Sequence, residues 1–533
     1  MAFRQQQQYV DYSDGVPDKV KQFVVYFYRH IRERNIPEIF SMYEVSFAKL
    51  SEMYFRGTTW PPVQYISSLV DDDSVFCLLY KEMYYRHLYA TVQPTLEQRC
   101  ESWDNYCALF NIILTSSINM QLPNGWLWDM VDEFVYQFQS WQQYRGKLSS
   151  KGAEELEALR SCEHMWSILS VLNYLQALAD KSGIAKELST VAGQEHFYTT
   201  EGYDQGTNVL RMVGYFSLVG LLRVHTLVGD YYGALKALGA IHPFQRSNLF
   251  TPKIATCNIS LYYYTGFCYL LLRRYTDAAR TFNIVLTYIS RVKQYHSRSA
   301  QYEQILKKNE QMYALTAITL ALCPAAQREL DETVMNTLKD KYNEKMGRMM
   351  RGIDSTYEEL FAYACPKFIT AAPPNLDAPG SNTNQEAYRL QLRCFQSMVQ
   401  EQQHLPSLKQ LLKLYTTISL PKLASLMDMN ETTLRSQLML LKMTGYCTTW
   451  NGEGDAAAGT RQAATEIDFH TDIDEDGVEL VSVEEVQQVR RQGEFLGRHI
   501  TKFKEIVRDL NMPPPTPADG GVAPRPRPAL TGY

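Results

Sequence analysis

Residues 420–446 read LPKLASLMDMNETTLRSQLMLLKMTGY, which is the pattern of a helix-turn-helix. The first predicted helix has an apolar face at positions i, i+3, i+4 and i+7, formed by Leu420, Leu423, Ala424 and Met427. A turn is predicted at Asp428–Met429, and Asn430 suits the N-cap of a second helix. That second helix would bury Leu434, Leu438 and Leu441. Because regulators that read DNA use this motif, nucleic-acid binding is the first hypothesis to weigh.

The outward face of the second predicted helix does not carry the side chains of a DNA-reading helix. Such a helix presents Arg, Asn or Gln to base edges and basic residues to phosphates. Here the outward positions are neutral and rich in methionine: Thr432, Ser436, Met439 and Met443. Methionine suits contact with protein, so we predict a protein partner on this face. An RNA contact through Lys422, Arg435 and Lys442 remains an alternative.

The composition narrows the function classes further. The chain has 533 residues, a net charge of -5 and 45% apolar residues, so a function based mainly on wrapping phosphates is not indicated. Ten cysteines occur without a CxxC pair, and Gly-rich phosphate loops, HExxH and GxSxG are all missing. We therefore expect no enzyme activity, no cofactor and no metal. The sequence also has no secretory signal and no apolar run of about 18 residues, which predicts a cytoplasmic protein that does not enter membranes.

A repeat precedes the helix-turn-helix. GLLRVHTLVGDYYGALKAL (220–238) and GFCYLLLRRYTDAARTF (266–282) share a glycine in a first helix and Tyr-x-x-Ala at the start of a second. The second copy fits tetratricopeptide spacing, in which small residues let paired helices approach closely and stack. The chain also contains 36 tyrosines, which suit either a long helical core or a partner surface.

Two strands are predicted after the helix-turn-helix, at 467–473 and 478–483, on either side of a turn at Asp476–Gly477. The acidic string DIDEDG (472–477) imitates a calcium loop but has Val483 in place of the bidentate Glu, so we interpret it as a hairpin tip. The predicted fold is mostly α: a TPR-like helical-repeat solenoid, then a winged helix, then a long C-terminal helix. The predicted organisation is a disordered N-terminus at 1–19, a helical-repeat domain at 20–364, a linker at 365–385, a helical lead-in and winged helix at 386–483 with a low-complexity loop at 451–464, a C-terminal bundle helix at 484–511, and a disordered Pro-rich tail at 512–533.

The C-terminal helix has the rhythm of a coiled coil. Its apolar residues alternate in steps of three and four, with a gap only at Gly493: Val486, Val489, Leu496, Ile500, Phe503, Val507 and Leu510. Such a seam needs a long straight partner, so we predict that this helix joins helices of other chains. The alternative is that it packs back on its own domain.

Helical repeats that run directly into a winged helix resemble the PCI architecture shared by subunits of the proteasome lid, the signalosome and a translation initiation factor. Several strings resemble one family within it, subunit L of eukaryotic translation initiation factor 3: LLYKEMYYRHLYA (78–90), LPNGWLWDMVDEFVYQFQSWQQYR (122–145), YEELFAYACPKFI (357–369) and RRQGEFLGRHITKF (490–503). The resemblance covers about residues 20–511, whereas the 451–464 loop and the tail depart from the family pattern.

The resemblance implies a non-catalytic scaffold that supports assembly of the 43S pre-initiation complex on the small ribosomal subunit and recruitment of mRNA. It implies that the winged helix at 420–483 joins an arc of winged helices and that the seam at 486–510 joins a helical bundle. The expected neighbours are the subunits designated E and K, with RNA contact at most secondary. Two alternatives stay open from the residues: a winged-helix nucleic-acid binder, and a subunit of a sister PCI complex.

Overall fold

The computed structural model describes residues 15–115, 120–203, 206–239, 241–244, 253–292, 302–377, 383–451, 454–463, 467–474, 477–485 and 488–511. The chain divides into two compact units. We call residues 1–406 with 446–464 the repeat unit, and residues 407–445 with 465–533 the winged-helix unit. The predicted tail at 512–533 and most of the predicted disordered N-terminus lie outside the described residues.

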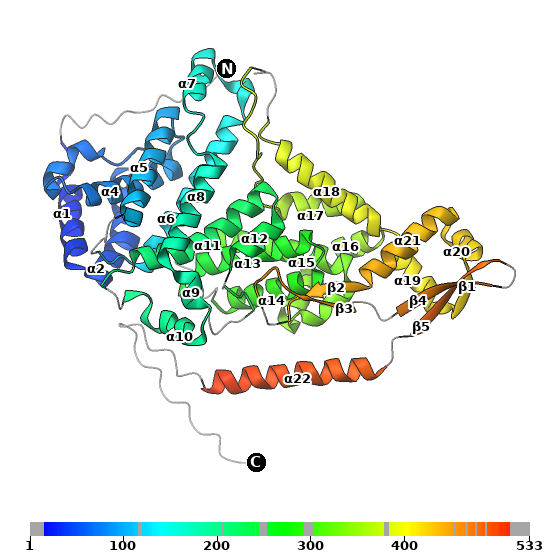
Figure 1. Ribbon diagram of the computed structural model, residues 1–533. Helices are drawn as coiled ribbons and strands as arrows, with labels where there is room; N and C mark the ends of the chain where they lie inside the picture. Colours follow the sequence, from blue (N-terminus) through cyan, green and yellow to red (C-terminus); the bar gives the residue numbers. More distant parts are fainter. Residues whose placement is uncertain are drawn as a thin grey trace. The chain divides into compact units, whose positions relative to one another are not determined.

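The first half of the repeat unit is a set of helices with a few short 3-10 and π turns (Figure 1). The helices are α1 (Asp18–Glu33), α2 (Ile36–Ser41), α3 (Phe47–Tyr54), α4 (Ser74–Thr91), α5 (Leu96–Thr115), α6 (Asn124–Arg145), α7 (Ala153–Ser161), α8 (Ile168–Ser182), α9 (Ile184–Leu188) and α10 (Val191–Thr200). Large aromatic side chains fill their core, among them the fully buried Trp60, Trp126, Trp141 and Trp166. Many tyrosines are also buried, including Tyr106, Tyr215, Tyr262, Tyr263 and Tyr269, so the core accounts for much of the tyrosine content.

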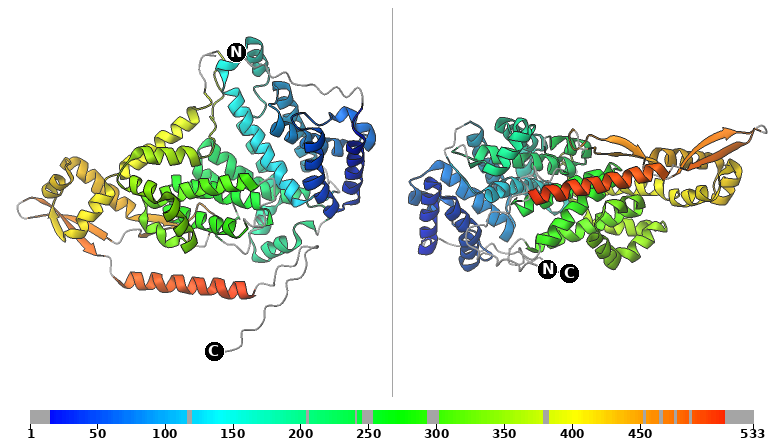
Figure 2. Two further views of the ribbon diagram at one scale, coloured as in Figure 1. Left: turned by 180° about the vertical axis from the view of Figure 1, so that it is seen from behind. Right: turned by 90° about the horizontal axis from the view of Figure 1, so that it is seen from below.

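The predicted repeats form successive helix pairs that lie side by side (Figures 1 and 2). They are α11 (Val209–Val228) with α12 (Tyr231–Ala237), α13 (Ala255–Leu271) with α14 (Tyr275–Val292), and α15 (Tyr302–Leu322) with α16 (Glu332–Met350). Gly266, the glycine of the second repeat, is required for a steric reason. A Cβ on Gly266 would lie 2.5 Å from the Phe282 ring of α14, so only glycine lets the two helices approach this closely. The expectation of a mostly α, TPR-like solenoid is confirmed.

The repeat unit continues through α17 (Asp354–Ala364) and α18 (Glu386–Gln402). The connection predicted as a linker between them packs on the unit in its described part. Phe368 and Ile369 are buried, and the Ile369 N–H donates to the Leu227 carbonyl at 2.9 Å. Farther along, the Thr383 N–H donates to the Gly146 carbonyl at 3.0 Å.

Three acidic side chains lie among the first helices: Glu82 is fully buried, and Asp129 and Glu133 are half-buried. The fully buried Glu82 accepts hydrogen bonds from Arg86 and from Trp126 Nε1, the latter at 3.1 Å. Burial raises the pKa of Asp129 to about 6 and that of Glu133 to about 7, because desolvation disfavours a carboxylate. Neighbouring Arg86 opposes both shifts only in part.

The segment predicted as a low-complexity loop, 451–464, does not form a free loop in its described part. Residues 446–449 (β2, Tyr446–Thr449) pair antiparallel with β3 (Thr460–Ala463), and this hairpin belongs to the repeat unit. Ala456, between the strands, is buried. The composition of this segment does not predict the hairpin, because the residues that hold it are far away in the sequence.

The winged-helix unit contains α19 (Leu405–Leu414) from Ser407 onward, β1 (Thr417–Ser419), α20 (Leu420–Met427), α21 (Glu431–Thr444), β4 (Ile467–Ile473) and β5 (Glu479–Glu485). Its sheet is antiparallel in the order β1-β5-β4. The predicted helix-turn-helix is confirmed: Asp428 makes the turn in the left-handed region at φ 53°, and Asn430 occupies the N-cap position. The three inward leucines of α21 are buried, while Met427 of α20 is half-buried.

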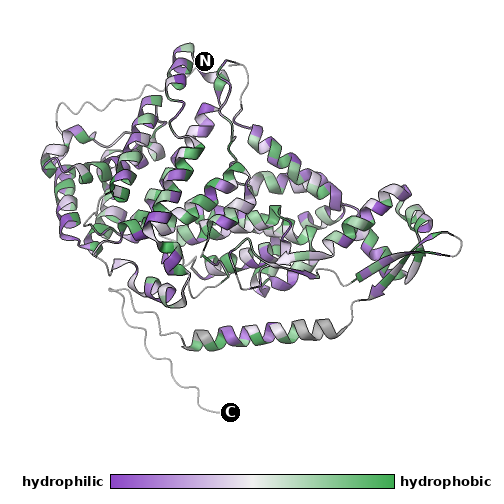
Figure 3. Cartoon of the chain, in the orientation of Figure 1, coloured by the Kyte–Doolittle hydropathy of each residue, from purple (hydrophilic) through white to green (hydrophobic). Residues whose placement is uncertain are grey.

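The last helix is α22 (Gln488–Asn511), 24 residues long. Where Figure 3 colours this helix, apolar (green) and hydrophilic (purple) residues alternate. The predicted seam residue Val486 lies outside the described residues, and of Val489 only the backbone is described.

Candidate protein-interaction surfaces

The outer side of α21 is an exposed, mostly neutral face. Met439 and Met443 are 64% and 60% exposed, and they lie one turn apart because their spacing is i, i+4. Ser436 and Thr432, one and two turns earlier, are exposed as well. The face points outward because Leu434, Leu438 and Leu441 take the buried side of the same helix. We name Thr432, Ser436, Met439 and Met443 the methionine face.

Two of the three cations considered for RNA contact are paired with acids of the wing. Arg435 Nε donates to a Glu479 carboxylate oxygen at 2.8 Å, and Glu431 lies 3.5 Å from the same guanidinium. Lys442 Nζ donates to the Asp468 carboxylate and to the Phe469 carbonyl. This hydrogen bond from Lys442 lowers the pKa of Asp468. These contacts offset the positive charge that a phosphate would need.

The third cation, Lys422, lies on α20. Its Nζ is 5.4 Å from the centroid of the Tyr415 ring, which is a cation–π arrangement. The three basic residues therefore stand in three different local environments rather than forming one uniform basic face.

The seam of α22 is exposed along the part of the helix whose side chains are described. The exposed fractions are 59% for Leu496, 55% for Ile500, 65% for Phe503, 54% for Val507 and 78% for Leu510. These positions follow steps of four and three, so they form one stripe. We name Leu496, Ile500, Phe503, Val507 and Leu510 the α22 seam.

The structure adds apolar residues that the heptad pattern omitted. Phe495 and Ile506 of α22 are also more than half exposed, and the Phe495 ring contacts His499 at a centroid distance of 4.2 Å. On α20, Leu426 is exposed. A search for all apolar side chains on these helices, not only those in heptad register, would have found them.

The tip of the wing is a plain hairpin end in its described residues. The Asp474 N–H donates to the Val478 carbonyl at 2.9 Å, and the Gly477 N–H donates to the Asp474 carbonyl at 2.8 Å. Asp472 pairs with His470 at 3.1 Å. Among the described residues, no group of three or more acidic, His or Cys side chains is arranged to hold a metal ion. Within the same part of the chain, no helix has the length and apolar character needed to cross a membrane.

The two units together define a helical-repeat protein that ends in a winged helix and a long amphipathic helix with an exposed seam. Residues 98–503 match the model of the family described as RNA polymerase I-associated factor PAF67. The chain is 44% identical over 508 residues to eukaryotic translation initiation factor 3 subunit L of Nematostella vectensis, covering 93% of this chain and 94% of that protein. It is 40% identical over 520 residues to the subunit L proteins of Gallus gallus and Homo sapiens, covering 93% of this chain and 90% of each relative. The chain belongs to the family of eukaryotic translation initiation factor 3 subunit L.

Proposed function

We propose that the chain is a non-catalytic scaffold subunit of translation initiation factor 3 that works in the cytoplasm through protein–protein contacts. The observation that carries this proposal is the exposed α22 seam. Its five residues expose more than half of their side-chain surface to water, although their spacing suits a helical bundle. The relatives are named as subunits of initiation factor 3, which supports the proposal that the seam is buried in that complex.

The seam is large enough to contribute strongly to binding. A helix of 24 residues is ~36 Å long at 1.5 Å per residue. Burial of one large apolar side chain stabilises by about 1.5–3 kcal/mol, so five would contribute about 7–15 kcal/mol before the costs of association. Those costs are about 4–15 kcal/mol, so further contacts must add to the seam. The winged-helix unit is the source that we propose.

The charge of α22 indicates what kind of helix would cover it. Between Gln488 and Asn511 there are six arginines and lysines against three acidic residues, in a chain whose net charge is -5. We therefore propose partner helices that are apolar on one face and acidic on the flanks. Subunits E and K of the factor are the proposed neighbours, and the methionine face of α21 is a second contact surface.

Contact with the small ribosomal subunit would occur through the assembled factor, in support of the 43S pre-initiation complex and mRNA recruitment. RNA contact by the chain itself is secondary in this proposal. Arg435 and Lys442 are already paired with Glu479 and Asp468, so an RNA phosphate would have to compete with these carboxylates.

Adjacent residues of α22 provide a matched test. Ile500 belongs to the seam, whereas Thr501 does not, and both side chains are exposed. Tagged full-length wild type, Ile500→Asp and Thr501→Asp would be recovered from eukaryotic cells, and co-purified proteins quantified by mass spectrometry. We expect wild type and Thr501→Asp to recover initiation factor 3 subunits and small-subunit ribosomal proteins, and Ile500→Asp to lose most of them.

Equal recovery by both variants would place assembly elsewhere and contradict the role of the seam. If wild type recovers no initiation-factor subunit, the scaffold proposal itself fails. A filter-binding series from low to physiological salt would then test the nucleic-acid alternative, because affinity that depends on phosphates falls steeply as salt rises.

A further inference from the structure

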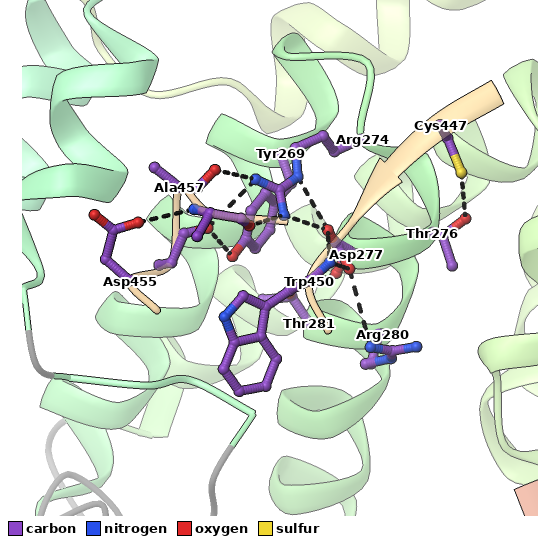
Figure 4. Close-up of polar contacts among 12 residues, drawn as sticks. Tyr269, Arg274, Thr276, Asp277, Arg280, Thr281, Cys447, Trp450, Asp455 and Ala457 are labelled. Carbon is purple, nitrogen blue, oxygen red and sulfur yellow. Dashed lines mark hydrogen bonds and ion pairs between the residues drawn. The ribbon is translucent and has the colours of Figure 1, made fainter. Parts of the chain in front are cut away.

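A buried ion pair lies at the start of α14, beneath the β2–β3 hairpin (Figure 4). Arg274 donates from Nε and Nη2 to one oxygen of Asp277, at 3.0 and 2.7 Å. Asp277 is fully buried and Arg274 nearly so. The same carboxylate also accepts the backbone N–H of Trp450, which directly follows β2, at 3.1 Å. A buried charge pair is favourable only when its remaining hydrogen-bonding groups are satisfied, and here the partners come from the hairpin segment.

The remaining guanidinium N–H groups bind consecutive backbone carbonyls between the strands. Arg274 Nη1 donates to the Ala457 carbonyl at 2.8 Å, and Nη2 donates to the Ala458 carbonyl at 2.9 Å. The Tyr269 hydroxyl donates to the Ala456 carbonyl at 2.7 Å. All three acceptors are backbone carbonyls, so these hydrogen bonds do not depend on the side chains of residues 456–458. The segment they bind is more than 180 residues away in the sequence.

Side-chain size still matters in this segment. Ala456 is almost fully buried, so a larger side chain would have no space there. At Gly459, an added Cβ would lie 2.8 Å from the Thr449 carbonyl oxygen and 2.8 Å from Thr448 Cγ2. Asp455 accepts the Ala458 N–H at 2.8 Å and so closes the turn that presents the carbonyls. The site therefore suits a short turn made of small residues.

The hairpin has little that would stabilise it alone. Its two strands have four residues each, and every residue of β3 is exposed. An isolated two-stranded hairpin is marginally stable in water, and the Gly- and Ala-rich composition between the strands does not favour a strand. The missing stabilisation has to come from docking on the repeat unit, where Trp450 also packs its ring 5.3 Å from that of Phe244.

We propose that Arg274, Asp277 and Tyr269 form an intramolecular binding site for the backbone carbonyls of the turn at residues 456–458, and that occupancy of this site folds the β2–β3 hairpin. We call this arrangement the backbone latch. The hairpin lies in sequence between α21 and β4, two elements of the winged-helix unit. The backbone latch therefore fixes to the repeat unit the segment through which the chain leaves the winged-helix unit and returns to it. With the backbone latch open, residues 446–463 become a long unfolded connection.

The test is amide hydrogen exchange, followed by mass spectrometry, in peptides that cover residues 446–463 of the full-length chain. Arg274→Met removes the donors, and Ala456→Leu blocks the site while leaving the ion pair intact. Arg273→Met is the matched control, because this neighbouring arginine pairs on the surface with Glu401 at 2.6 Å. We expect exchange in the hairpin to be at least about tenfold faster in both latch variants, which corresponds to about 1.4 kcal/mol. In Arg273→Met and in helices α11 and α15 it should stay at the wild-type level.

Unchanged protection of the hairpin in Ala456→Leu would overturn the proposal. If Arg274→Met unfolds the repeat unit, which far-UV circular dichroism would show, Ala456→Leu alone decides. Faster exchange of the hairpin in Arg273→Met to the same extent would also overturn it, since the effect would not be specific to the buried arginine. None of these outcomes depends on whether the chain assembles with other subunits.

Discussion

Helices α14 and α22 carry similar apolar stripes and have opposite environments. In α14, no residue of the stripe is more than 2% exposed; the stripe consists of Ala278, Phe282, Val285, Leu286 and Ile289. In α22, each residue of the α22 seam is more than half exposed. Periodicity predicts both helices equally well, because it reports that a helix has an apolar face. It does not report whether the cover for that face comes from the same chain. The difference between the two helices therefore separates surfaces that fold the protein from those that are available to a partner.

The largest expected effect comes from one matched pair of truncations. Phe282→Ala should lower the free energy of unfolding by about 3–5 kcal/mol, because it leaves a cavity against Gly266, which the Phe282 ring now contacts. Phe503→Ala in the isolated chain should change it by no more than ~0.5 kcal/mol, since its ring is exposed. Urea denaturation of both variants measures the difference. Similar losses in the two would mean that the α22 seam is already covered within the free chain.

The order of the two variants should reverse for binding. In a reconstituted complex with partner subunits, Phe503→Ala should weaken association by about 2 kcal/mol, or roughly thirtyfold, if the ring lies at the centre of the bundle. Thr501→Ala, two positions away and off the seam, serves as the control. Titration calorimetry with the purified partner subunits gives both affinities. A loss below twofold for Phe503→Ala would exclude it as a central contact.

Glu133 of the repeat unit and Asp468 of the winged-helix unit should respond to pH in opposite directions. For Glu133 the folded pKa is about 7 against an ordinary value of 4.5, so its stabilising contribution is complete below pH 4.5 and is lost as the pH rises to 7. Glu133→Gln should therefore raise the free energy of unfolding by about 1–2 kcal/mol at pH 8, with a smaller gain near pH 5. The pKa of Asp468 is lowered by Lys442, so its contribution is lost at acidic pH instead.

Urea denaturation at pH 5 and pH 8 measures the Glu133 effect. Glu157→Gln provides the control, because that carboxylate is largely exposed on α7 beside Arg160. An identical difference between wild type and Glu133→Gln at both pH values would show that proton binding by Glu133 is not responsible.

The elements that the sequence predicts are those that depend on local spacing. The helix-turn-helix was predictable from local spacing: Leu420, Leu423 and Ala424 are buried as predicted, and Met427 is half-buried. Strand β1 was missed because its three residues are too short for a pattern, and its pairing with β5 joins positions that are distant in the sequence. Residues 451–464 were predicted as a low-complexity loop and the β2–β3 hairpin was not foreseen, because the residues that hold it, Arg274 and Asp277, lie more than 170 residues earlier. Contacts at long sequence separation leave no local signal in either segment.

The outer α21 face shows the same limit on a smaller scale. Its Arg435 was considered for RNA contact because it is basic, whereas the structure pairs it with Glu479, which follows 44 residues later. The alternative of nucleic-acid binding therefore depends partly on Arg435 and Lys442, which are paired with Glu479 and Asp468 of the wing. The methionine face and the α22 seam remain predictions for partner binding, and both carry apolar side chains that are more than half exposed.

The smallest expected change in stability is at the exposed ion pair between Arg435 and Glu479. Arg435→Ala should lower the free energy of unfolding by less than about 1 kcal/mol, because surface ion pairs between exposed side chains are weak. It should also leave RNA affinity within twofold of wild type if Glu479 already neutralises the guanidinium. Glu479→Gln is the informative partner variant, since it frees Arg435 and should increase RNA binding at low salt. Fluorescence anisotropy with a short single-stranded RNA measures both. A large loss of RNA affinity in Arg435→Ala would instead make the winged helix a nucleic-acid surface, and the contrast between α21 and the repeats would then be one of ligand class as well as of exposure.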